Sequence, residues 1–229
     1  LIPTMKQRLA SPAKLVSLTG IADMQGVSQS GGVLSIGGAT THAAVSAQAG
    51  GFAGLAALAG GIGDPAVRNR GTIGGSLANN DPAACYPSAA LATGATIVTN
   101  TREIAADDYF QGMFETALDE GEIITAVRMP IPEASNYQKF EQPASRFALV
   151  GVFVAKYASG VRVAVTGASE GGVFRWSEAE AALGANFSAD AVSGLSVAAD
   201  DMIEDLHGSK AYRAHMVKVM TGRAVAAAG

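Results

Sequence analysis

The sequence has 229 residues, enough for one large domain or two smaller ones with a hydrophobic core. Hydrophobic residues make up 48% and charged residues 16%, which excludes a disordered chain, and the net charge of −4 argues against a nucleic-acid-binding protein. The single cysteine, Cys85, excludes a disulfide framework and a self-contained iron–sulfur cluster, and we expect a cytoplasmic protein.

The first part of the chain predicts short strands and alanine-rich helices. We expect strands at residues 14–18 and 33–37, and Thr41 as the N-cap of a helix whose first turn holds His42. The uncharged run 43–63 has nearly the length of a membrane span. Because several glycines interrupt this run, we expect a buried helix pair and not a transmembrane protein.

The middle of the chain alternates between helix and strand patterns. We expect a helix at 87–92, a hairpin of 95–99 with 102–104, and a strand at 122–128. Prolines 130 and 132 follow, and we place a domain boundary near Glu133.

The second half predicts a hairpin followed by helices. Two β-rich runs, 147–157 and 161–166, are joined by Ala158-Ser-Gly160. Helical patterns follow at 177–183, at 189–195 and in a final helix with Ser209 as its N-cap, whose apolar positions Tyr212, Met216, Val219 and Met220 recur at helical spacing. Strands followed by helices in both halves indicate an α+β fold.

The glycine-rich loop between Arg68 and Pro82 is the strongest candidate for chemistry. It places Gly74-Gly75 between the hydroxyls of Thr72 and Ser76. Glycines let a backbone approach a ligand closely, and hydroxyls add hydrogen-bond donors without bulk. The loop therefore indicates a site for a phosphate or a flavin edge. No Lys-Ser or Lys-Thr follows the glycines, so it is not a Walker loop.

Two other glycine motifs compete with this loop. Residues 61–66 fit a dinucleotide-binding pattern, but a helical stretch precedes them, so we reject a Rossmann site. Residues 167–171 fit the G-x-S-x-G pattern of a hydrolase with Ser169 as nucleophile. The chain also offers acid and base partners in the matching order, namely Asp200, Asp201 or Asp205 and then His207 or His215. A turn between two strands explains this glycine motif more simply, and a hydrolase remains the alternative.

Residues 62–78, Ile-Gly-Asp-Pro-Ala-Val-Arg-Asn-Arg-Gly-Thr-Ile-Gly-Gly-Ser-Leu-Ala, resemble the second FAD-binding motif of the molybdenum hydroxylase flavoproteins. These flavoproteins are the medium subunits of enzymes of the carbon monoxide dehydrogenase and xanthine dehydrogenase types. The resemblance continues through residues 35–42, 112–128, 139–151 and 208–215, and so covers nearly the whole chain.

The resemblance implies an α+β fold in which a FAD-binding domain of the vanillyl-alcohol-oxidase/PCMH type, with an incomplete first subdomain, precedes a smaller α+β flavoprotein C-terminal domain with an antiparallel sheet and helices. It implies three parts. Residues 1–26 are a remnant of the first FAD-binding subdomain and residues 27–133 are the second subdomain. Residues 134–229 are the C-terminal domain, similar to that of carbon monoxide dehydrogenase flavoproteins.

The resemblance also implies which residues bind FAD: Leu1, Ile62, Val67, Thr72, Ile73, Gly74, Gly75, Ser76, Asn79, Asp81, Ile124, Gln142 and Phe147. Residues 72–76 would hold the cofactor, while Gln142 and Phe147 would approach the isoalloxazine ring. Cys85 stands where relatives usually carry Asp, which would remove one hydrogen bond to the cofactor. The family's first FAD motif would end at Leu1, so the 229 residues by themselves are expected to bind FAD weakly or not at all.

By this resemblance, the protein is a FAD-binding electron-transfer subunit that passes electrons from iron–sulfur clusters through FAD to an external acceptor. Molybdopterin is expected on a large partner subunit and [2Fe-2S] clusters on a small one, so we assign no catalytic acid or base and no metal ligand to this chain. The substrate and the acceptor stay open. The alternatives are a structural assembly module without functional flavin and the Ser169 hydrolase.

Overall fold

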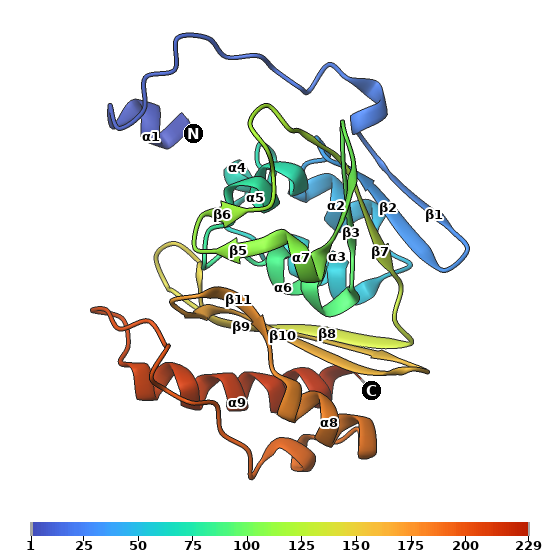
Figure 1. Cartoon of the computed structure of the whole chain (residues 1–229), viewed down its shortest axis with the longest axis vertical. Helices are drawn as coiled ribbons and strands as arrows, with labels where there is room; N and C mark the ends of the chain where they lie inside the picture. Colours follow the sequence, from blue (N-terminus) through green and yellow to red (C-terminus); the bar gives the residue numbers. More distant parts are fainter. Residues whose placement is uncertain (1, 229) are drawn as a thin grey trace.

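The computed structural model describes residues 2–228, which form an α+β protein with two main antiparallel sheets. In Figure 1, the helices of the first part of the chain lie above the four-stranded sheet. Helices α8 (Ser177–Ala185) and α9 (Lys210–Ala228) lie below it. The α+β class and the antiparallel C-terminal sheet are confirmed.

The five-stranded sheet belongs to the first part of the chain. Its order is β1 (Val27–Ser30), β2 (Val33–Gly37), β7 (Ile124–Pro130), β3 (Thr96–Thr99) and β4 (Glu103–Ala105). The expected β3–β4 hairpin is confirmed, with Ile97 opposite Ile104. The strand β7 begins two residues later than expected, and β1, whose exposed side chains give no apolar pattern, was not expected.

Helices fill the space between the two sheets. They are α2 (His42–Gln48), α3 (Ala53–Gly60), α4 (Pro65–Arg68), α5 (Ile73–Asn79), α6 (Tyr86–Thr93) and α7 (Ala106–Tyr109), followed by the small pair β5 (Phe110–Gly112) and β6 (Glu115–Thr116). Thr41 caps α2 as expected, since its side chain accepts the Ala44 N–H at 3.3 Å. The alanine-rich run is the expected buried helix pair, and no helix within residues 2–228 is long and apolar enough to cross a membrane.

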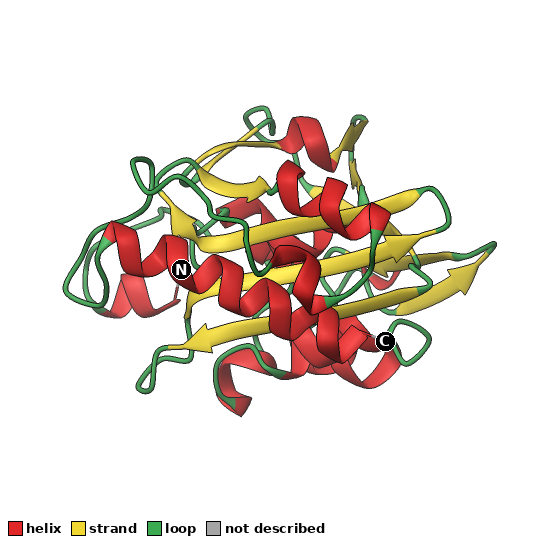
Figure 2. Ribbon diagram, turned by 90° about the horizontal axis from the view of Figure 1, so that it is seen from below, coloured by secondary structure: helices red, strands yellow, loops and turns green. Residues whose placement is uncertain are grey.

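The C-terminal sheet has the order β11 (Gly172–Arg175), β10 (Gly160–Ser169), β9 (Ala148–Tyr157) and β8 (Ala134–Glu141). Its outer face is covered by α8 (Ser177–Ala185) and α9 (Lys210–Ala228), and Figure 2 shows the long helix α9 lying across this face. Ser209 caps α9 as expected, because its hydroxyl accepts the Tyr212 N–H at 3.3 Å.

The hydrophobic core crosses the expected boundary near Glu133. Phe153 of β9 is fully buried and packs edge-on against Phe52, with ring centroids 6.0 Å apart. A second core lies between the C-terminal sheet and helices α8 and α9, around Trp176 and Val217. Both parts of the chain thus share one core, and their division into separate domains stays a prediction.

Four expectations about elements are wrong. Residues 14–17 are exposed and Leu18 is half-buried, and the segment 14–18 forms no strand and pairs with none in the described chain. The glycine-rich loop instead contains helix α5. Residues 189–195 form only a short 3₁₀ helix at Ala189–Val192. Tyr212, expected on the core face of α9, is 39% exposed.

Candidate functional site

Three segments meet by close backbone contact at the start of α5. The Gly74 N–H donates to the carbonyl oxygen of Gly38 at 2.9 Å, and a Cβ on Gly74 would lie 2.6 Å from that same oxygen. A Cβ on Gly38 would overlap the carbonyl oxygen of Ile124. Glycine is therefore required at both positions by backbone packing. We call this meeting point of Gly38, Gly74 and Ile124 the glycine node.

Thr72 organises the N-terminus of α5. Its side-chain oxygen accepts the Gly75 N–H at 3.1 Å, and the Ile73 N–H donates to Thr40 at 3.1 Å. The first N–H groups of the helix thus have partners within the protein. A ligand would reach this end through the hydroxyls of Thr72 and Ser76 and through the exposed backbone of Gly75.

Ile73 and Ile124 support the glycine node from the core. Their side chains are 0% and 4% exposed. They pack in the first hydrophobic core and fix the backbone of α5 and β7. Of the expected site residues on α5, Gly75 and Asn79 are exposed, and Leu1 lies outside the described residues.

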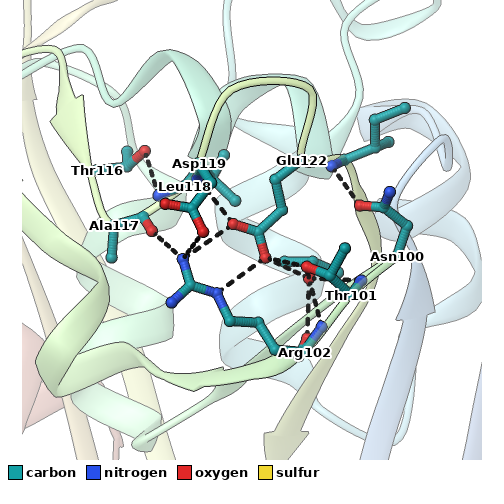
Figure 3. A network of polar contacts seen from close by, with 10 residues as sticks. Asn100, Thr101, Arg102, Thr116, Ala117, Leu118, Asp119 and Glu122 are labelled. Atoms are coloured by element: carbon teal, nitrogen blue, oxygen red, sulfur yellow. Dashed lines mark hydrogen bonds and ion pairs between the residues drawn. The ribbon is translucent and has the colours of Figure 1, made fainter.

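A polar network fixes the segment that leads to Ile124 (Figure 3). The carboxylate of Glu122 accepts the Thr99 hydroxyl at 2.6 Å and pairs with Arg102, whose Nε and Nη2 each lie 3.0 Å from one of its oxygens. The hydrogen bonds from Arg102 and from Thr99 hold the pKa of Glu122 far below its ordinary value. Glu122 was not expected to have this role, because the sequence indicated only a strand at 122–128.

The segment after α5 is held by both parts of the chain. Asn80 is 2% exposed, has a left-handed backbone and donates from Nδ2 to Gly112 and Glu115 at 2.8 Å each. The Pro82 carbonyl accepts the Thr166 hydroxyl at 2.9 Å. This segment carries the expected site residue Asp81 and ends at Cys85, so the position of both depends on the C-terminal sheet.

The loop between α3 and α4 and helix α4 itself also carry expected site residues. Arg68 donates from Nη1 to the carbonyl oxygens of Ile62 and Gly63 at 3.1 Å and 2.7 Å. Val67, another expected site residue, is 47% exposed beside it. The loop is thus fixed by a guanidinium whose charge would favour an anionic ligand nearby.

Gln142 and Phe147 lie at a different place, in a cavity of about 690 Å³ between the two parts of the chain. Pro82 and Ala83, which follow Asp81, line the same cavity. Apart from Ile62 in the loop between α3 and α4 and Val67 in α4, the expected site residues therefore form two groups, one at the start of α5 and one at this cavity. The segment 80–85 runs between these two groups.

Lys139 of β8 links the loop between α3 and α4 to the loop that precedes Phe147, and it was not expected as a site residue. Its side chain is 5% exposed, and Nζ donates to the carbonyl oxygens of Gly61 and Arg146 at 2.7 Å each. Lys139 is two residues after Tyr137, which packs on the core residue Phe153. Because alternate residues of a strand share a face, the position of Lys139 two residues after an aromatic side chain is the sequence signal for a buried ammonium.

Two buried polar atoms near the start of α5 show what kind of cofactor would fit there. His42 Nδ1 and the Tyr86 hydroxyl have no hydrogen-bond partner within the described residues. The two rings lie 5.3 Å apart, and the His42 ring contacts Gly71, which precedes Thr72. Burial lowers the pKa of His42 to about 4, so the imidazole is neutral, and burial raises the pKa of Tyr86. Unpaired buried polar atoms and the flanking hydroxyls of Thr72 and Ser76 fit a polar cofactor such as FAD.

The elements that flank the two competing glycine motifs differ from those that a Rossmann site and a hydrolase elbow require. Residues 61–64 lie between helices α3 and α4, and Pro65 and Ala66 begin α4. A helix and not a strand precedes the motif, which confirms the rejection of a Rossmann site. Ser169 ends strand β10, and a tight turn leads directly to β11. A hydrolase elbow needs a helix after the serine, so the hydrolase alternative is wrong on this point.

Comparisons with known proteins agree with this geometry. Residues 1–132 match the family described as "FAD binding domain in molybdopterin dehydrogenase". The nicotine 6-hydroxylase medium subunit of Paenarthrobacter nicotinovorans is 34% identical, over 100% of this chain and 87% of the relative. The carbon monoxide dehydrogenase medium chain of Afipia carboxidovorans is also 34% identical, over 70% of this chain and 59% of the relative.

Solved structures give the same result. The crystal structure of a Cu,Mo-CO dehydrogenase in its cyanide-inactivated form matches with a TM-score of 0.87 and 31% identity. The match covers 100% of this chain and 86% of that chain.

Proposed function

Because this chain belongs to the family of FAD-binding domains in molybdopterin dehydrogenases, we propose that it is the flavin-carrying medium subunit of a molybdenum hydroxylase complex. In this proposal it receives electrons from iron–sulfur clusters on a small partner subunit and passes them through FAD to an external acceptor. A large partner subunit carries molybdopterin and oxidises the substrate. The described residues supply binding and orientation for the cofactor.

The single observation that carries this proposal is the glycine node. Gly38, Gly74 and Ile124 come from three of the segments in which the sequence resembles the flavoprotein family, and their backbones contact one another. The arrangement requires glycine in two separate segments of the chain. It places the hydroxyls of Thr72 and Ser76 at an accessible helix end.

FAD supplies the redox chemistry when bound, since flavin accepts electrons singly and releases them in pairs. Thr72 and Ser76 would donate hydrogen bonds to the phosphates, and Arg68 would contribute positive charge beside the Ile62 loop. Gln142 and Phe147 would orient the ring, with the aromatic side chain packing against it.

The proposal is tested on the complete protein purified together with its neighbouring chains. We expect co-purification with a large chain and a small cysteine-rich chain. We also expect a visible flavin absorption that is bleached when substrate is added anaerobically. A colourless complex that still assembles would support a structural assembly module instead. A flavin that stays oxidised while the other centres are reduced would contradict the electron-transfer role.

A further inference from the structure

Lys139 is a buried cation between the α3–α4 loop and the loop that precedes Phe147. Its ammonium is taken from water, which is costly unless polar atoms compensate the charge. Two carbonyl oxygens do so, those of Gly61 and Arg146, at 2.7 Å each. The nearest carboxylate, Glu141, lies 3.7 Å away and is 45% exposed, so this ion pair is weak.

The two carbonyl partners belong to two segments with expected FAD-binding residues, which we call the two walls of the proposed flavin site. Gly61 is the C-cap of helix α3 and immediately precedes Ile62. Arg146 immediately precedes Phe147, in a loop closed by the bond from the Arg146 N–H to Gln142 at 2.8 Å. Arg146 also has a left-handed backbone, with φ of 59°, so this loop is held in a strained shape. One ammonium therefore ties a strained loop to the opposite wall.

The thiol of Cys85 also lies beside the Lys139 ammonium. The Sγ of Cys85 lies 3.9 Å from Lys139 Nζ, and Cys85 is 6% exposed. Burial raises the pKa of the Cys85 thiol, the Lys139 charge opposes this effect, and Glu141 adds to it. The hydroxyl of Tyr137 lies in the same buried region. Cys85 is the single cysteine of the 229 residues, so among them it alone reports on Lys139 through its reactivity.

We propose that Lys139 is a positioning residue of the flavin site, whose ammonium clamps the loop of residues 142–147 to the Gly61–Ile62 wall and covers Cys85. This inference rests on the proposed function. Lys139 acts through the backbone that carries Gln142 and Phe147. Without the ammonium, the loop loses its hydrogen bond at the Arg146 carbonyl, and with it the link to Gly61, and swings away from the wall.

The test compares Lys139→Met with Lys139→Arg in the complete protein, and Lys218→Met on α9 is the control for the loss of a lysine. The thiol reagent DTNB is applied to the folded protein without flavin. In Lys139→Met we expect the Cys85 reaction to accelerate about tenfold or more as the buried thiol becomes accessible. Arg at this position should preserve the wild-type rate.

The second measurement is FAD binding, followed by quenching of flavin fluorescence. We expect the dissociation constant of Lys139→Met to rise about tenfold, as for the loss of one hydrogen bond to a charged group. Lys139→Arg and Lys218→Met should bind as the wild type does. An unchanged thiol rate or an unchanged dissociation constant in Lys139→Met overturns this inference but not the proposed function. A wild-type protein that binds no FAD overturns both the inference and the proposed function.

Discussion

The N–H group of Gly74 donates to the carbonyl oxygen of Gly38 at 2.9 Å, so helix α5 begins in direct contact with the end of strand β2. A side chain on Gly74 cannot be accommodated, because its Cβ would lie 2.6 Å from that oxygen. The contact joins two segments that are 36 residues apart in the sequence. It determines where the hydroxyls of Thr72 and Ser76 lie.

Replacing Gly74 by Ala should separate α5 from β2. We expect the free energy of unfolding to fall by about 1–3 kcal/mol, as for other overpacked sites, and FAD affinity to fall with it. Chemical denaturation measures the first effect. Gly184→Ala is the matched control, because Gly184 lies in helix α8 with no atom within 4 Å of an added Cβ. This control should gain about 0.5–1 kcal/mol, and equal losses in both variants would contradict the packing argument.

Thr72→Val removes the hydroxyl while keeping the side-chain shape. Loss of the N-cap should cost about 1 kcal/mol of stability. Ser209→Ala removes the cap of α9 and should cost a similar amount. Only Thr72→Val should weaken FAD binding, which equilibrium dialysis can measure. If both variants bind FAD equally well, Thr72 is only a helix cap.

Glu122 should make stability depend on pH. Since its pKa in the folded protein is below the ordinary 4.5, its stabilisation is present above that pH and is lost as the pH falls towards the folded value. The free energy of unfolding should therefore decrease as the solution is acidified below about pH 5. In Glu122→Gln this decrease should be smaller and the stability at neutral pH lower. Glu120→Gln, at an exposed position, is the control, and an acid profile in Glu122→Gln equal to that of the wild type would refute this role.

Phe153 should couple the two parts of the chain. Phe153→Ala should lower stability by about 3–5 kcal/mol, because it empties a fully buried site between Phe52 and Tyr137. The single tryptophan, Trp176, reports on the C-terminal core, and far-UV circular dichroism reports on the whole fold. Both probes should give the same unfolding curve in the wild type. Two separate transitions would show that residues 27–133 and 134–229 unfold independently.

Much of the fold could be predicted because periodicity and capping are local. The Thr41 cap, the β3–β4 hairpin and the C-terminal antiparallel sheet follow from short patterns that the structure confirms. Helix α5 was missed because a glycine pair disfavours helix, and its stability comes from contacts with Gly38 and Thr40, which are distant in sequence.

The candidate site was predicted less completely. The family resemblance pointed to residues 72–76, but the part played by Lys139 depends on three segments that meet only in the folded chain. Residues 14–18 show the opposite case, a local β pattern without a neighbouring strand in the described chain.

The most direct test of the proposed site is the molar ratio of FAD to chain in the purified complete protein, compared between the wild type and Gly75→Leu. Gly75 is exposed, and an added Cβ meets only the side chain of Thr72, at 3.0 Å. The larger side chain should therefore block the cofactor without unfolding the protein. We predict equimolar FAD in the wild type and almost none in a Gly75→Leu protein with an unchanged circular dichroism spectrum. Equal FAD content in both proteins, or none in the wild type, would contradict the proposed site.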